Sequence, residues 1–164
     1  MKNKLTKLEF KWICYDMGNS AFILLVATIL PIYFNYLSSS QGVAEHNYLS
    51  YILYAASLST LIVALAGPIL GTLADYKDHK KKIFLTCAML GALALACFWI
   101  PSSWFAFLVL FIAAKVAYSL SLIVYDSMLT DITTEERMDA VSSKGYAWGY
   151  IASVVPFIIS LIFV

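Results

Sequence analysis

The feature that most constrains this chain is a long apolar run that stops abruptly within residues 67–82, GPILGTLADYKDHKKK, where small residues give way to Asp75 and a cluster of lysines. A bilayer core offers no water to a polypeptide backbone, so a membrane-embedded chain turns only where polar partners exist. Lysine-rich turns are retained on the cytoplasmic side. The stretch therefore predicts a tight cytoplasmic loop between two membrane helices of a polytopic protein.

Composition supports this class. The chain is 62% hydrophobic and 13% charged, whereas soluble domains are about 45–50% apolar and about 25% charged. No basic face suited to nucleic acid is present, so no nucleic-acid partner is expected. Cys14, Cys87 and Cys97 lie in apolar segments without metal-type spacing, so no disulfide framework or zinc site is implied. The sequence also lacks a catalytic cluster and a phosphate-binding loop, so an enzyme is not expected.

The predicted fold is all-α, with about five transmembrane helices forming one bundle over residues 1–164. Each apolar stretch is near or above the roughly 20 residues that cross the hydrocarbon core. The predicted spans are residues 12–37, 48–74, 83–100, 104–129 and 141–164. The first is not a cleaved signal, because its apolar region is too long and contains polar residues.

Apart from Lys115, basic residues lie in or beside alternate connections between these spans. They lie before the first span, between the second and third, and around the connection that follows the fourth: Lys2, Lys4, Lys7, Lys11, Lys77, Lys80, Lys81, Lys82, Arg137 and Lys144. Connections 38–47 and 101–103 contain neither lysine nor arginine. The positive-inside rule then places the N-terminus in the cytoplasm and the last residues outside. We expect an inner (cytoplasmic) membrane protein, or a vacuolar one if the chain is eukaryotic.

Polar residues follow helical spacing on two of the spans. Asp16, Asn19 and Ser20 share one face of the first span. Lys115, Ser119 and Asp126 form a stripe on the fourth, flanked by Tyr118 and Tyr125. These two spans are predicted to face a protein interior or a water-filled cavity. The fifth span carries the small residues Gly145, Gly149 and Ser153 four apart, a pattern typical of close helix packing.

Three blocks of sequence carry a resemblance. Gly71 to Asp75 followed by Lys80 to Lys82 resembles the loop motif between helices two and three of the major facilitator superfamily. WICYDMGNSAF at 12–22 and GYAWGY at 145–150 resemble the vacuole-effluxer-like branch, whose fungal members are associated with amino-acid export. The blocks occur in the expected order over essentially the whole chain. Tyr76 and Asp78 depart from the superfamily pattern, which has arginine and glycine there.

The resemblance implies helices 1–5 of a six-helix N-terminal half, in which the first and fourth helices line a central cavity. The chain would lack the sixth helix and the second half, so the implied partners are the bilayer, a small solute, and a C-terminal half or second subunit. The implied function is part of a secondary active transporter that works by alternating access on an amino-acid-like or other anionic metabolite. The alternatives are a non-transporting structural or assembly subunit and a truncated, inactive fragment. No cofactor is implied, and proton or ion coupling stays open.

Lys115 is the most informative candidate residue. It lies about 16 Å along its helix from Trp104, near the middle of a core about 30 Å thick. A central charge costs about 2.5–3.5 kcal/mol on insertion scales, so it requires water, an anion or a counter-ion. Three interpretations remain: an anion-binding or coupling lysine, a partner of an acid on an absent helix, or a deprotonated lysine bonded to neighbours such as Tyr118.

The remaining candidates lie toward the predicted cytoplasmic side. Asp16 and Asp126 are expected together at the cytoplasmic mouth, either for proton coupling or gating or as structural partners of Arg137 or Lys144. The candidate substrate path comprises Asp16, Asn19, Lys115, Tyr118, Ser119 and Asp126. The candidate loop motif and gate comprise Gly71, Asp75, Lys80 and Lys81, with Asp75 expected mainly to fix the turn. Thr133 or Thr134 is a candidate cap for a short helix.

Overall fold

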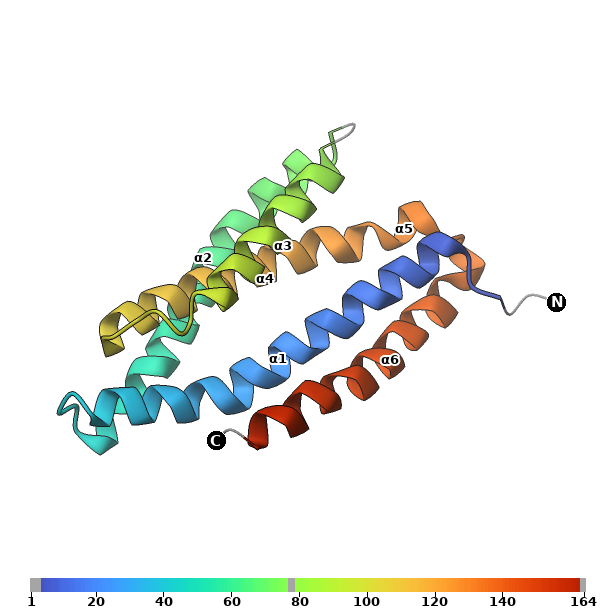
Figure 1. Ribbon diagram of the computed structural model, residues 1–164. Coiled ribbons are helices and arrows are strands. Elements are labelled where there is room, and N and C mark those ends of the chain that lie inside the picture. Colours follow the sequence, from blue (N-terminus) through green and yellow to red (C-terminus); the bar gives the residue numbers. More distant parts are fainter. Residues whose placement is uncertain (1–3, 77–78, 163–164) are drawn as a thin grey trace. The chain divides into compact units, whose positions relative to one another are not determined.

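The computed structural model describes residues 4–76 and 79–162, so Lys2, Lys77, Asp78 and the last two positions of the fifth predicted span lie outside the described residues. The described chain is helical and contains no strand, which confirms the all-α prediction. Its helices are α1 (Lys7–Ser39), α2 (Glu45–Ala74), α3 (Lys80–Ala96), α4 (Trp104–Ser127), the single turn α5 (Leu129–Ile132) and α6 (Glu135–Leu161) (Figure 1).

Three of the described stretches are long and apolar enough to cross a membrane: Lys7–Ser39, His46–Ala74 and Trp104–Ile132. The third predicted span falls on α3, which has 17 residues and ends at Ala96. Its length of about 26 Å is less than the about 30 Å of the hydrocarbon core. The fifth falls on α6, which begins with the charged residues Glu135 and Glu136. The count of five spans therefore stays a prediction.

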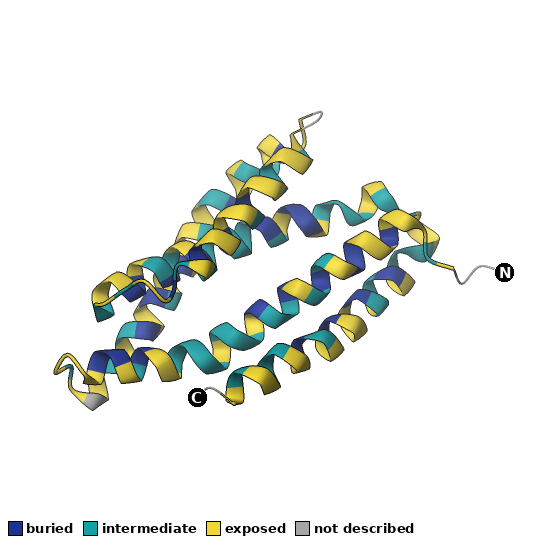
Figure 2. Cartoon of the chain, viewed as in Figure 1, coloured by how far each residue is buried: buried dark blue, intermediate teal, exposed yellow. Residues whose placement is uncertain are grey.

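The chain divides into two compact units. The first comprises Met1–Ile32 and Leu129–Val164, and the second comprises Tyr33–Met128. In the first unit α1 and α6 run side by side (Figure 1), and the short α5 leads into α6. Buried residues recur along both helices of this pair (Figure 2). Helix α1 continues across the boundary, so its last residues belong to the second unit.

In the second unit α4 packs against both α2 and α3, which contact each other much less. An aromatic cluster lies at one end of this unit. The ring centroid of the buried Phe107 lies 5.7, 5.4 and 5.1 Å from the ring centroids of Tyr33, Phe34 and Phe98. Farther along, α3 approaches α4 at Gly91, where an added Cβ would lie 3.6 Å from the Tyr118 backbone nitrogen. The aromatic rings around Phe107 and the absence of a side chain at Gly91 together set how closely α4 packs within this unit.

Two connections of the second unit meet at one end of it. The Gln41 side chain donates a hydrogen bond from Nε2 to the Ser102 carbonyl at 2.6 Å and accepts one from the Trp104 backbone nitrogen at 3.2 Å. These contacts join connections 38–47 and 101–103, the two that lack basic residues. At the start of α3, Lys80 Nζ donates to the carbonyl of Ser127, at the end of α4, at 3.3 Å.

Candidate functional site

The start of α1 is fixed by a reciprocal pair of hydrogen bonds. The Thr6 backbone nitrogen donates to Glu9 Oε2 at 2.7 Å, and the Glu9 backbone nitrogen donates to Thr6 Oγ1 at 3.2 Å. This is the capping-box arrangement, in which two backbone groups of a helix start are satisfied at once. It turns the Glu9 carboxylate back over the first turn, and only 1% of Glu9 remains exposed.

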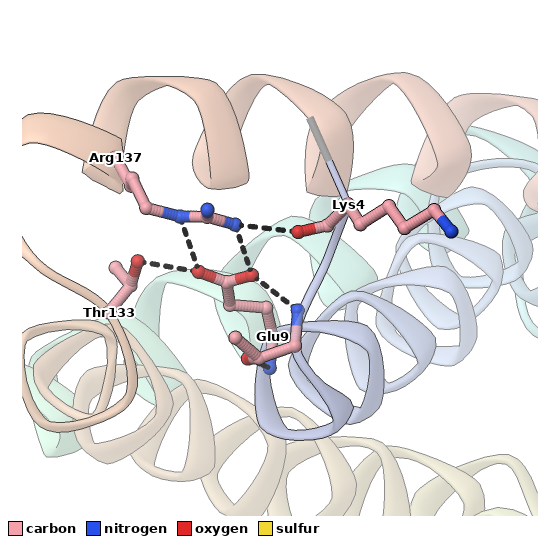
Figure 3. Close-up of polar contacts among 5 residues, drawn as sticks. Lys4, Glu9, Thr133 and Arg137 are labelled. Atoms are coloured by element: carbon pink, nitrogen blue, oxygen red, sulfur yellow. Dashed lines mark hydrogen bonds and ion pairs between the residues drawn. The ribbon is translucent and has the colours of Figure 1, made fainter. Parts of the chain in front are cut away.

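The same carboxylate binds residues from the other end of the chain. Arg137 donates from Nε to Glu9 Oε1 at 3.0 Å and from Nη2 to Oε2 at 2.8 Å, while Thr133 Oγ1 donates to Oε1 at 2.8 Å (Figure 3). Arg137 Nη2 also donates to the Lys4 carbonyl at 3.1 Å. A planar guanidinium matches a carboxylate in this two-point geometry. The cluster ties the start of α1 to the start of α6.

Glu9 stays ionised in this setting. Burial raises the pKa of its carboxyl, but the hydrogen bonds from Thr6, Thr133 and Arg137, together with the Arg137 charge, outweigh burial and lower the pKa to about 2. Glu9 lies in the first turn of α1, before the apolar span predicted from residue 12, so this ion pair lies at the polar end of the helix. The carboxylate is held by donors on both oxygens, and we assign it a structural role.

Sequence reasoning missed Glu9 and assigned its partners elsewhere. Arg137 was expected to pair with Asp16 or Asp126, whereas its guanidinium binds Glu9. Thr134 does occupy the N-cap position of α6, but its side chain makes no capping hydrogen bond, and the Thr133 hydroxyl goes to Glu9 instead. The available signal was Thr6 followed three residues later by Glu9, the sequence signature of a capping box.

Beyond this cluster, α1 and α6 approach each other through glycines. A Cβ added at Gly145 would lie 2.9 Å from the Trp12 ring and 3.0 Å from Asp16 Oδ2, and one added at Gly149 would lie 2.5 Å from Ser20 Oγ. Ser153 is buried one turn farther on, and its hydroxyl donates to the Tyr150 carbonyl at 2.9 Å. The small-residue ridge of α6 thus faces the polar face of α1.

Asp16 and Asn19 are themselves buried, each with 8% of its surface exposed. The two side chains are hydrogen-bonded to each other, and Asn19 Oδ1 has no hydrogen-bond partner in the described structure. These residues belong to the first unit. A buried carboxylate and an unsatisfied amide oxygen therefore stand together on one hydrophobic helix.

The other candidates for the substrate path belong to the second unit and lie on α4. Lys115, Tyr118 and Ser119 are half-buried and Asp126 is exposed. The buried face of α4 includes Phe107, Phe111, Ala114, Ser121 and Tyr125. At 100° per residue, Lys115, Ser119 and Asp126 form a stripe about 100° away from that face, while Tyr118 lies on it. The common path with Asp16 and Asn19 stays a prediction.

The residues of the loop motif lie at the ends of α2 and α3. The Asp75 backbone nitrogen donates to the Gly71 carbonyl at 3.2 Å and closes α2, while the Asp75 side chain is exposed. Gly71 has open space where a Cβ would stand. Lys80 reaches α4, as described above, and Lys81 is exposed. Their role in gating stays a prediction.

An apolar hollow of about 580 Å³ lies between the end of α3 and the start of α4. It is lined by Cys97, Ile100, Pro101, Phe105, Ala106, Val109, Leu110 and Ala113. This lining offers no charged side chain to a polar solute. Its chemistry instead suits contact with lipid chains.

Comparison with known proteins decides the family. Residues 6–164 match the family model described as "Vacuole effluxer Atg22 like". The chain belongs to this family. Over 165 aligned residues it is also 38% identical to "Uncharacterized MFS-type transporter YxiO" of Bacillus subtilis (strain 168). That alignment covers 98% of the chain and 38% of the relative, so the chain spans well under half the length of this relative. No solved structure matches.

Membership in the vacuole-effluxer-like family confirms the resemblance that the three sequence blocks carry. The family and the bacterial relative are transporters rather than enzymes. Together with the three apolar helices, this makes the chain an integral membrane protein that crosses the bilayer more than once. Its orientation and the membrane in which it resides remain predictions.

Proposed function

We propose that the chain is part of a secondary active transporter that moves a small, amino-acid-like or other anionic metabolite by alternating access. The observation that carries this proposal is the family match over residues 6–164. It is supported by polar side chains on two hydrophobic helices, α1 and α4. Polar side chains are costly inside a membrane and commonly mark the pathway of a substrate or an ion. In transporters of this type the solute site lies near the middle of the bilayer, between structural repeats.

Within that function we propose that Lys115 recognises the negative charge of the solute. It lies on a helix that is otherwise apolar around it, between the buried Ala114 and the half-buried Val116. Lys115 is half-buried, and its stripe is centred about 100° from the middle of the face that α4 buries, so part of its side chain is accessible. A desolvated lysine binds a carboxylate more strongly than a hydrated one does, because the interaction is screened less. Ser119, one turn along, would supply a further hydrogen-bond donor.

A whole transporter of this kind requires more protein than this chain. The bacterial relative is much longer, and two halves enclose the solute pathway in the superfamily. We propose that α1 to α6 form part of the first half and that the remaining segment closes the pathway. Asp16, Asn19, Ser119 and Asp126 would then line it, and Asp75 with its lysine-rich surroundings would act at the cytoplasmic gate.

Reconstitution in liposomes tests this function. The chain is reconstituted alone, and also together with the part of YxiO that the alignment does not cover. Uptake of labelled amino acids and small organic anions is then measured. We expect no saturable uptake by the chain alone and saturable uptake by the combination. Saturable transport by the chain alone would overturn the proposal that a further segment is needed to close the pathway. Absence of uptake of every solute by a correctly inserted combination would overturn the proposed substrate class.

A further inference from the structure

Two buried oxygen acceptors on α1 lack the positive charge that their setting demands. Asp16 and Asn19 lie three residues apart and therefore share a helix face. Each is more than nine-tenths buried, and Asn19 Oδ1 has no hydrogen-bond partner. Among residues 4–76 and 79–162, no lysine or arginine forms an ion pair with Asp16. A buried charge without a counter-charge and an orphaned buried acceptor are both costly, and a bound ion is one arrangement that satisfies both.

The neighbouring helix of the same unit faces these oxygens with glycines. Asp16 Oδ2 faces α6 at Gly145, where even a Cβ would come within 3.0 Å of it. Ser20, one turn farther along α1, faces Gly149 in the same way, and its hydroxyl adds a third oxygen. Both facing positions of α6 are glycines, so this side presents backbone instead of charged side chains. The side-chain oxygens of Asp16 and Asn19 therefore favour a ligand that is not part of the first unit.

We propose that Asp16 and Asn19 bind a monovalent metal cation of the sodium type, with Ser20 as an additional oxygen ligand. Hard cations prefer carboxylate, amide and hydroxyl oxygens. One carboxylate supplies one negative charge, which matches a monovalent ion, whereas divalent sites usually draw on several carboxylates. In the described part of the chain, no three His, Cys, Asp or Glu side chains gather into such a site.

The side-chain amide of Asn19 gives the site two states. It donates to Asp16 in the structure, so its oxygen points away from the carboxylate. A half-turn of the amide exchanges its nitrogen and oxygen and presents Oδ1 beside the carboxylate, an arrangement that only a cation between the two oxygens makes favourable. Cation binding is independent of transport, but a role as the coupling ion of the transporter rests on the function proposed above.

Thermal unfolding of the purified full chain in detergent tests the site without any transport assay. The unfolding midpoint is measured in sodium, potassium and choline chloride at constant ionic strength and pH. We expect sodium to raise the midpoint in a saturable manner, as a ligand that binds only the folded state must. Asp16→Asn and Asn19→Ala should abolish this response. Asp139→Asn, which removes an exposed carboxylate of α6, should retain it.

Three outcomes would overturn the proposal. The first is an equal rise in choline, and the second is a sodium response that survives Asp16→Asn. The third is a chain that sodium does not stabilise but a lower pH does, with the effect of pH lost in Asp16→Asn. That result would mean that Asp16 binds only a proton. If Asp16→Asn does not fold, binding of radioactive sodium to the unaltered chain gives the answer directly. It should be displaced by excess unlabelled sodium and not by choline. Asp16→Glu, which keeps the carboxylate, should bind about tenfold more weakly.

Discussion

At the scale of single residues, Lys115 carries the substrate proposal because its charge lies on an apolar helix and its side chain is only half-buried. Lys115→Met keeps much of the apolar stem and deletes the charge. A charged hydrogen bond contributes about 1.5–3 kcal/mol, so we expect the solute concentration for half-maximal uptake to rise by about 10- to 100-fold in the combined transporter. Lys115→Arg should be milder. Lys11→Met, which removes an exposed lysine of α1, serves as the matched control. Unchanged affinity in Lys115→Met would remove the basis for an anionic substrate.

The Glu9 cluster gives a second prediction at this scale. Because the pKa of Glu9 is lowered from 4.5 to about 2, the ionised carboxylate stabilises the folded state above about pH 4.5, and this contribution is lost as the pH falls toward 2. Glu9→Gln should lower the free energy of unfolding near neutral pH by about 1–3 kcal/mol. Unfolding midpoints measured across this range should converge with those of the unaltered chain at the acid end. Glu135→Gln, an exposed first-turn carboxyl, should cost only a few tenths of a kcal/mol, up to about 1. A pH-independent deficit in Glu9→Gln would contradict the ion-pair explanation.

At the scale of helices, the glycines of α6 set how closely it approaches α1. Gly149→Ala places a Cβ 2.5 Å from Ser20 Oγ and 3.3 Å from Ser20 Cβ, so the Ser20 hydroxyl must rotate or the helices must separate. We expect a loss of about 1–3 kcal/mol, although alanine favours an isolated helix by about 1 kcal/mol over glycine. Gly18→Ala on α1, where no atom lies within 4 Å, should be neutral or stabilising. Chemical unfolding in detergent measures both. Ser20→Ala should partly rescue Gly149→Ala, and additive effects of the two changes would contradict direct contact.

The helices and polar stripes were predictable because they depend on local patterns. Apolar run length placed α1, α2 and α4 within a few residues. Helix ends were harder to predict. Hydropathy extended the third span to Ile100, but α3 ends at Ala96. Pro101 disfavours helix at the residue before it, and Ser103 opens α4 by accepting a hydrogen bond from Ala106. The Glu9–Arg137 pair lies outside local reasoning altogether, since its members are 128 positions apart and nothing near either of them indicates the other.

At the scale of the whole molecule, the decisive property is which connections face the cytoplasm. Gln41 joins the two lysine-free connections at one end of the second unit, and Lys80 binds the end of α4, as successive antiparallel spans require. The positive-inside rule assigns the lysine-rich connection to the cytoplasm. We therefore expect His46 outside and His79 inside.

Cysteine labelling decides this orientation. His46→Cys and His79→Cys are made separately in a chain whose Cys14, Cys87 and Cys97 are replaced by alanine, and intact cells receive a membrane-impermeant thiol reagent. Position 46 should be labelled and position 79 protected, because the bilayer excludes the reagent from the cytoplasm. In permeabilised cells the reagent should label both positions, which controls for burial of either thiol. Both positions lie in or beside connections, where a polar side chain is tolerated. The reverse pattern in intact cells would invert the topology. It would place the lysine-rich loop outside and the Glu9–Arg137 cluster with it, so the proposed cytoplasmic gate would fail together with the orientation.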